Sequence, residues 1–163
     1  MRKQGGKTAN TNGNQLESLV KQILEDKEYQ FINKNKFLLA TRGLEQKLYT
    51  RQLTICESIY STEDCKHEIH ADFVIYNPAK GEKSIIIECK SQTSEGSVDE
   101  KYVYTNENIK NKYPYKTIVI LDAPGAKQGA KKWLKEQEKT NDNLLKVFQD
   151  FSEFRAWAIK NLD

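Results

Sequence analysis

Apolar residues recur along the chain with the two periods that distinguish helices from strands. Asn14 is typical of an N-cap residue, and Glu17 follows it at the third helical position. Residues 1–13 have almost nothing to bury, so we expect a flexible tail before a single domain at 14–163. Spacings of three and four residues predict that the domain opens with a helix over residues 14–30, whose apolar side is formed by Leu16, Leu19, Val20, Ile23 and Leu24.

Farther along the chain, runs of β-branched and aromatic residues have the length of strands. They lie at residues 48–60, 71–75, 84–92, 116–122 and 144–148. Further helices are predicted from Ser97 to Pro114, around Trp133 and Leu134, and after Ser152. A strand, a helix and a second strand imply a parallel crossover, whereas the earlier strands form antiparallel pairs. The pattern therefore predicts an α/β fold with a mixed central sheet flanked by helices.

The stretch from residue 70 to residue 92 is predicted to form a β-hairpin. Its turn, residues 76–83, contains an Asn-Pro pair and Gly81, which are typical turn residues. Asp72 lies on the first strand, and side chains of the second strand alternate between two faces. One face is expected in the core and carries Ile85, Ile87 and Cys89. The other face carries Ile86, Glu88, Lys90 and Gln92.

The charged groups on this hairpin need a compensating partner if they are buried. An unpaired buried carboxylate costs several kcal/mol, and a divalent cation would offset that cost. Asp72 and Glu88 could hold Mg²⁺ together with a backbone carbonyl and waters, because Mg²⁺ prefers hard oxygen ligands. Lys90 would face the same site as Glu88. The alternative interpretation is a solvated hairpin face that carries ordinary surface ion pairs.

The spacing of these residues carries a resemblance to a known family. Asp72, fifteen further residues and then Glu88, Cys89 and Lys90 resemble the motif of the PD-(D/E)xK nuclease superfamily. The resemblance implies a restriction-endonuclease-like αβββαβ core with the acid and the E-x-K segment on neighbouring strands. Ala71 replaces the proline of the motif, a position that varies in the superfamily. The segment K-S-Q-x-x-x-G-S-x-x-E-K at residues 90–101 is similar to the type II restriction endonuclease branch.

This resemblance implies roles for the motif residues. Asp72, Glu88 and the backbone carbonyl of Cys89 would hold Mg²⁺, with Mn²⁺ as an alternative ion. Lys90 would orient or help to deprotonate the attacking water, or neutralise the developing charge. Glu17 has two interpretations, as a capping-box residue near the positive helix end or as the acid that many superfamily members carry on this helix.

Five side chains are candidates for contacts with DNA. Gln92 lies one face-repeat beyond Lys90, and Lys101 belongs to the segment that the resemblance places beside the active site. Arg42 could reach a phosphate, and Lys127 and Lys131 accompany a predicted helix start, which favours phosphate. For each of these cations the alternative is an ordinary solvated surface position.

Composition adds limits to this picture. A chain of 163 residues is the size of one domain, and a net charge of +3 permits a nucleic-acid partner without requiring one. Three cysteines without C-x-x-C spacing indicate neither a disulfide framework nor a zinc site and favour a reducing cytoplasm. No apolar run approaches the ~20 residues that cross a bilayer. We therefore expect a soluble cytoplasmic protein, and the family resemblance implies a prokaryotic cell.

The sequence leaves three functions open. The leading prediction is a type II restriction enzyme of a restriction-modification system, acting on double-stranded DNA as a homodimer, because one short domain supplies one catalytic site. A structure-selective repair or recombination nuclease, such as a junction resolvase, would share the core. A nuclease-fold DNA-binding module without turnover is the third alternative.

Overall fold

A computed structural model describes residues 5–41, 45–81, 84–92 and 98–163. Its centre is a six-stranded sheet in which the strands lie in chain order. The strands are β1 (Gln30–Phe31), β2 (Leu48–Glu57), β3 (Glu68–Tyr76), β4 (Ile85–Ser91), β5 (Lys116–Asp122) and β6 (Leu144–Phe148). The helices are α1 (Gly5–Asp26), α2 (Lys34–Ala40), α3 (Val98–Asn111), α4 (Gln128–Glu136) and α5 (Phe151–Asn161), with 3₁₀ turns η1 (Pro78–Lys80) and η2 (Gln137–Lys139).

The sheet is mixed, as the sequence predicts. β2 pairs antiparallel with β3, and β3 pairs antiparallel with β4. β5 is parallel to β4 on one side and to β6 on the other, and short β1 is parallel to β2. The order α1, β2, β3, β4, α3, β5 gives the expected αβββαβ core, with β1 and α2 inserted after α1.

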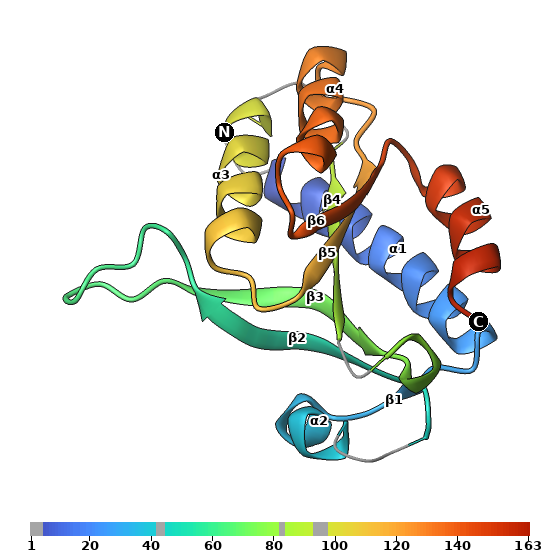
Figure 1. The fold of residues 1–163 in the computed structure, drawn as a ribbon. Coiled ribbons are helices and arrows are strands. Elements are labelled where there is room, and N and C mark those ends of the chain that lie inside the picture. Colours follow the sequence, from blue (N-terminus) through green and yellow to red (C-terminus); the bar gives the residue numbers. More distant parts are fainter. Residues whose placement is uncertain (1–4, 42–44, 82–83, 93–97) are drawn as a thin grey trace.

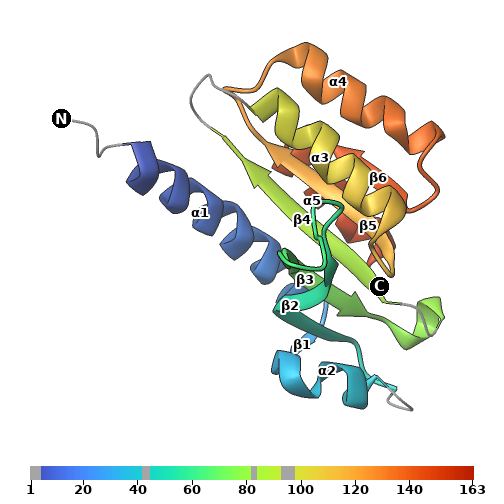
Figure 2. The same ribbon diagram turned by 90° about the vertical axis from the view of Figure 1, so that its left-hand side faces the viewer.

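Helices cover both faces of the sheet. Figure 2 shows α1 on one side and α3 and α4 on the other, and Figure 1 shows α5 beside α1. Each face has its own apolar cluster, so both faces of β4 are core, whereas the sequence predicts only one. Ile87 packs with residues of α1 and α5, and Ile86 packs with residues of α3 and α4.

The β3–β4 connection confirms the turn chemistry. The Asn77 side chain accepts a hydrogen bond from the backbone N–H of Ala79 and so caps η1. Gly81 follows with φ of 99°, a conformation that is strained for residues with a Cβ. The two strands pair from Ile75 opposite Ile85 to Phe73 opposite Ile87. β2 and β3 then run across the direction of β4 and β5 (Figure 1), so β3 and β4 separate beyond Phe73.

Several predicted boundaries are wrong. α1 begins at Gly5, so residues 5–13 are helical and Asn14 is not an N-cap, and α1 ends at Asp26 instead of residue 30. A helix that is already nucleated by a packed segment can extend through poor helix formers one bond at a time. The first strand ends at Glu57 instead of residue 60. α5 is capped by Asp150, whose carboxylate accepts the N–H of Glu153 at 2.9 Å, rather than by Ser152.

Candidate active site

The site lies where β3 and β4 separate. Continuing the register beyond Phe73 and Ile87 places Asp72 level with Glu88. At this point the Asp72 side chain replaces a backbone carbonyl as the acceptor between the strands, because its Oδ2 accepts the backbone N–H of Cys89 at 2.8 Å. Its other oxygen, Oδ1, lies 3.4 Å from the amide nitrogen of Gln52. Asp72 is therefore fixed in the opening between the two strands.

The backbone carbonyl of Cys89 faces the same opening. In an extended strand the N–H and C=O of one residue point to the same neighbouring strand. Because the Cys89 N–H points to Asp72, its carbonyl oxygen does so as well. The carbonyl and the Asp72 carboxylate are thus directed at a common space.

Glu88 is the buried acid of the site. Its exposed fraction is 2%, and both of its carboxylate oxygens accept hydrogen bonds. The Lys90 ammonium donates to Oε2 at 2.6 Å, and the Tyr113 hydroxyl donates to Oε1 at 3.0 Å. The carboxylate is therefore held in one orientation by donors on two different elements.

Tyr113 is a site residue that the sequence analysis missed. It follows α3 and is buried, and it reaches Glu88 because the crossover from β4 returns the chain to the start of β5. The separation of 25 residues matches no local period, so the hydrogen bond could not be inferred from the sequence pattern.

Burial and neighbouring charges together raise the pKa values of both Glu88 and Lys90. Burial raises the pKa of Glu88 above its ordinary 4.5, the neighbouring Lys90 lowers it, and the negative charge of Asp72 raises it further. For Lys90, burial lowers the pKa, but the carboxylates of Glu88 and Asp72 outweigh burial and leave it above its ordinary value. Lys90 is therefore an ammonium ion at neutral pH, and one third of its side chain is exposed (33%).

The raised pKa of Glu88 predicts a distinctive pH dependence of stability. The folded state binds this proton more tightly than the unfolded state between pH 4.5 and the higher folded pKa. The Glu88 contribution to the free energy of unfolding is therefore full below pH 4.5 and is lost as pH rises through the folded pKa. Urea unfolding in EDTA should show this fall in the native protein, and Glu88→Gln should remove it.

The difference in pH dependence of stability between the native protein and Glu88→Gln is assigned to Glu88, because the two proteins share every other titrating group. Glu68→Gln is a matched control, since Glu68 is exposed at the start of β3. This control should leave the slope of stability against pH as it is in the native protein. Equal slopes for the native protein and Glu88→Gln would contradict the assignment.

Glu17 lies on the α1 side of the sheet. Its carboxylate forms an ion pair with Arg51 at 2.5 Å, and the Arg51 guanidinium lies 5.2 Å from the centre of the Phe73 ring. The capping-box interpretation is wrong, because α1 begins at Gly5 and Glu17 is in its interior. Burial raises the pKa of the Cys89 thiol well above its ordinary value, and the charge of Glu17 makes a smaller contribution to this shift. The catalytic role of Glu17 stays a prediction.

The donor groups at the opening fit a hard divalent cation. Among the described residues no three His, Cys, Asp or Glu side chains cluster closely enough to hold a metal. Two carboxylates and a carbonyl nevertheless suffice for Mg²⁺, which usually keeps several waters and takes one or two protein carboxylates. Each carboxylate oxygen of Glu88 has a second lone pair beyond the one used by Lys90 or Tyr113.

Two candidate DNA contacts border this end of β4. Gln92 is half-buried directly after the strand, and its backbone N–H donates to the Asp122 carbonyl at 3.2 Å. Lys101 is exposed on the first turns of α3. Gly96 and Ser97, which belong to the segment resembling type II enzymes, lie outside the described residues.

The other three candidates are placed differently. Lys127 is exposed at the N-cap position of α4, without a side-chain capping bond. Lys131 is only 7% exposed, and its ammonium donates to the Gln149 carbonyl at 3.3 Å. The structure therefore argues against Lys131 as a phosphate contact. Arg42 lies outside the described residues.

Comparison with protein families assigns the chain to a superfamily. The sequence matches the family described as a PD-(D/E)XK nuclease superfamily domain over residues 8–162, nearly the whole chain. The chain belongs to the PD-(D/E)XK nuclease superfamily. The predicted superfamily and the predicted restriction-endonuclease-like fold are thus confirmed, and members are generally nucleases that act on nucleic acid. No curated protein and no solved structure matches the chain.

The superfamily assignment gives the motif residues a context. PD-(D/E)XK nucleases typically use divalent metal ions, which agrees with the oxygen-rich opening beside Asp72 and Glu88. None of the described helices is both long enough and apolar enough to cross a membrane.

Proposed function

We propose that this PD-(D/E)XK protein is a Mg²⁺-dependent DNA endonuclease that hydrolyses phosphodiester bonds, and that it acts as a type II restriction enzyme. The observation that carries the proposal is the buried Glu88 carboxylate beside Asp72, paired with the Lys90 ammonium at 2.6 Å. A buried acid next to a second acid is unfavourable for folding. A domain without turnover would have no need of this arrangement.

The residues divide the chemistry among them. Asp72, Glu88 and the Cys89 carbonyl would hold the ion, which when bound polarises the phosphate and lowers the pKa of a coordinated water. Lys90 would orient or help to deprotonate that water, or neutralise charge that develops on the phosphate oxygens. Tyr113 keeps Glu88 oriented through its hydrogen bond to Oε1.

The exposed positions of Lys101 and Lys127 support a proposal for substrate binding. We propose that Lys101 and Lys127 contact DNA phosphates and that Gln92 positions the scissile strand, with Arg42 as a further phosphate contact. One catalytic site per chain and two strands per duplex favour a homodimer on a two-fold symmetric site. Light scattering should give the mass of a dimer, and a monomer that makes double-strand breaks would contradict the dimer proposal.

Incubation with a mixed-sequence plasmid tests the function. In Mg²⁺ or Mn²⁺ the protein should convert the plasmid into discrete fragments, and EDTA should stop the reaction, because the phosphate is activated by the metal. Sequencing of the fragment ends reads out the cleavage position and the recognition sequence together.

The same assay separates the alternatives. Cleavage of branched substrates alone would support a junction-resolving nuclease in place of a restriction enzyme. Binding without cleavage in either ion would support a DNA-binding module and overturn the proposal of an endonuclease. The double variant Asp72→Asn and Glu88→Gln is the control, since any cutting that it retains comes from a contaminating nuclease.

A further inference from the structure

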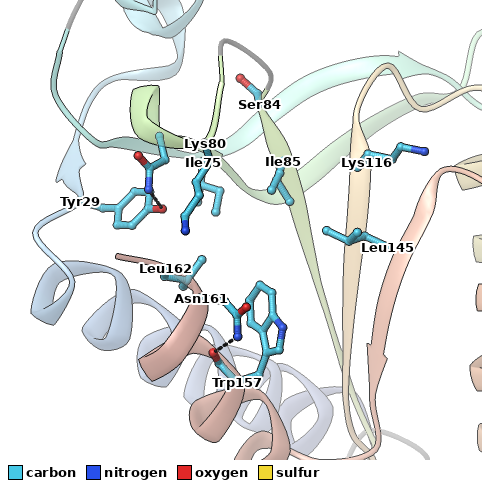
Figure 3. Close-up of a pocket in the computed structure, with 11 residues that line it drawn as sticks. Tyr29, Ile75, Lys80, Ser84, Ile85, Lys116, Leu145, Trp157, Asn161 and Leu162 are labelled. Atoms are coloured by element: carbon cyan, nitrogen blue, oxygen red, sulfur yellow. Dashed lines mark hydrogen bonds between the residues drawn. The ribbon is translucent and has the colours of Figure 1, made fainter.

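A cavity lies away from the motif residues. It has a volume of about 330 Å³ and is formed where the β3–β4 connection, the start of β5, β6 and α5 meet (Figure 3). Its wall includes Ile85, the first residue of β4, whereas Glu88 lies farther along the same strand. Ile85 packs on the α1 and α5 side, and Glu88 is on the face of Ile86, which packs with α3. The cavity and the candidate active site are therefore on opposite faces of the sheet.

The wall of the cavity is mainly apolar, with a planar indole ring. The apolar lining consists of Ile75, Ile85, Leu145, Trp157 and Leu162. The Trp157 ring packs against Phe148 and Phe154, with centroid distances of 5.5 Å and 6.3 Å, so it is fixed from behind. Leu145 is 44% exposed, which leaves a large apolar side chain at the rim open to solvent. Small-molecule sites have this composition, an apolar wall with a few polar groups, and volumes from about 300 Å³ upward.

The polar groups of the cavity favour an anion. Its lining contains two lysines and no carboxylate. In Figure 3 the Lys80 amine points into the space between Tyr29 and Leu162, whereas the Lys116 amine points away from it. The Lys116 ammonium donates to the backbone carbonyl of Asp142, so its charge is held at the rim.

The Asp163 side-chain carboxylate, which interacts with the charge of Lys80, is already paired. The Asp163 carboxylate accepts a hydrogen bond from Lys27 at 2.7 Å, and this bond is the main cause of its lowered pKa. The charge of Lys80 contributes only a smaller part of that shift. Among the described residues Lys80 itself donates no hydrogen bond to a carboxylate, so its charge can serve a ligand.

We propose that this cavity binds a small planar organic anion. The ring of the ligand would pack against Trp157 and the apolar wall, and its anionic group would bind the Lys80 ammonium. The class includes ring-bearing phosphates, such as nucleoside monophosphates, and aromatic carboxylates or sulfonates. The site is independent of the proposed nuclease reaction, because the cavity and Glu88 lie on opposite faces of the sheet.

Tryptophan fluorescence tests the proposal directly. The full chain has two tryptophans, so Trp133→Phe makes Trp157 the sole reporter. Three probes are titrated: AMP, the uncharged adenosine, and the aromatic sulfonate 1-anilinonaphthalene-8-sulfonate. We expect saturable changes of Trp157 emission with the two anions and much weaker binding of adenosine.

Two lysine variants provide the matched comparison. Lys80→Met keeps the apolar stem and should weaken binding of the anions about tenfold, the effect of losing one hydrogen bond to a charged group. Lys116→Met should change it by less than about twofold, because that ammonium points away from the cavity. Lys80 is exposed, so its substitution should leave the fold intact, as circular dichroism will verify.

Each outcome decides the matter. Binding of AMP without the sulfonate assigns a phosphate-bearing ligand, and binding of the sulfonate alone assigns an aromatic carboxylate or sulfonate. The proposal is overturned by the absence of saturable change with either anion up to about 1 mM. Equal affinities of AMP and adenosine, or equal effects of the two lysine variants, would also overturn it.

Discussion

Asp72→Asn should reduce plasmid cleavage in Mg²⁺ by a factor of at least ~100 while the protein stays folded. Asparagine has nearly the same shape, and its remaining oxygen can still accept the Cys89 N–H that Asp72 accepts at 2.8 Å. The substitution therefore removes the negative charge and keeps the bridge between β3 and β4. Cleavage is measured from the rate of plasmid nicking, and stability from urea unfolding.

Stability adds a second readout. The charge of Asp72 disfavours the buried Glu88 carboxylate but favours the Lys90 ammonium, so the two effects of removing it oppose each other. Without metal, Asp72→Asn should therefore stay close to the native protein in stability. If Asp72→Asn loses activity but keeps its stability, Asp72 serves the reaction and not the fold. Glu68→Gln, an exposed change on the same strand, is the control and should leave both quantities unchanged. Native rates of nicking in Asp72→Asn would remove Asp72 from the mechanism.

Strand positions were predictable because their signal is local. The run of isoleucines that leads to Glu88 is apolar on both faces, which suits a central strand covered by helices on both sides. The same local alternation puts Glu88 and Lys90 on one face, and the structure joins them at 2.6 Å. The two-residue strand β1 was not predictable, since Gln30 and Phe31 are too few to show a period.

Contacts that depend on tertiary packing were not visible in the sequence. The bond of Tyr113 to Glu88 and the ion pair of Glu17 with Arg51 join residues 25 and 34 positions apart. Lys131 is instructive, because a usable signal existed. It precedes Leu134 by three residues, so both lie on one side of α4, and that side faces the core. The lysine-rich composition of α4 led to the prediction of a phosphate contact, whereas the spacing of Lys131 from Leu134 indicated that Lys131 is buried.

Lys90→Met should abolish cleavage and also destabilise the protein at neutral pH. It leaves the Glu88 carboxylate buried with Tyr113 as its one remaining donor among the described contacts. Removing one partner of a fully buried ion pair costs about 3–5 kcal/mol. Since a third of the Lys90 side chain is exposed (33%), solvent screening should reduce this cost to roughly 2–3 kcal/mol. Lys110→Met, on the exposed side of α3, is the matched loss of one charge and should have little effect on either property.

The loss of stability should depend on pH in a way that identifies its cause. Lys90 lowers the pKa of Glu88, so without Lys90 the folded pKa moves still farther above 4.5. The destabilisation should therefore be small at about pH 5, where Glu88 can take up a proton, and grow as pH rises through the higher folded pKa. Urea unfolding in EDTA at about pH 5 and about pH 8 measures the difference.

A second substitution separates the structural role of Lys90 from its chemical role. In Lys90→Met with Glu88→Gln the buried negative charge is gone, and the glutamine can still accept the Tyr113 hydroxyl. Stability at about pH 8 should return toward the native value, because the desolvation cost of the carboxylate has been removed. Cleavage should stay absent, because an ammonium and a metal-binding acid are both missing. If the double variant regained stability and nicked plasmid as well, the ion pair would serve only the fold, and catalysis would have to be sought elsewhere in the chain.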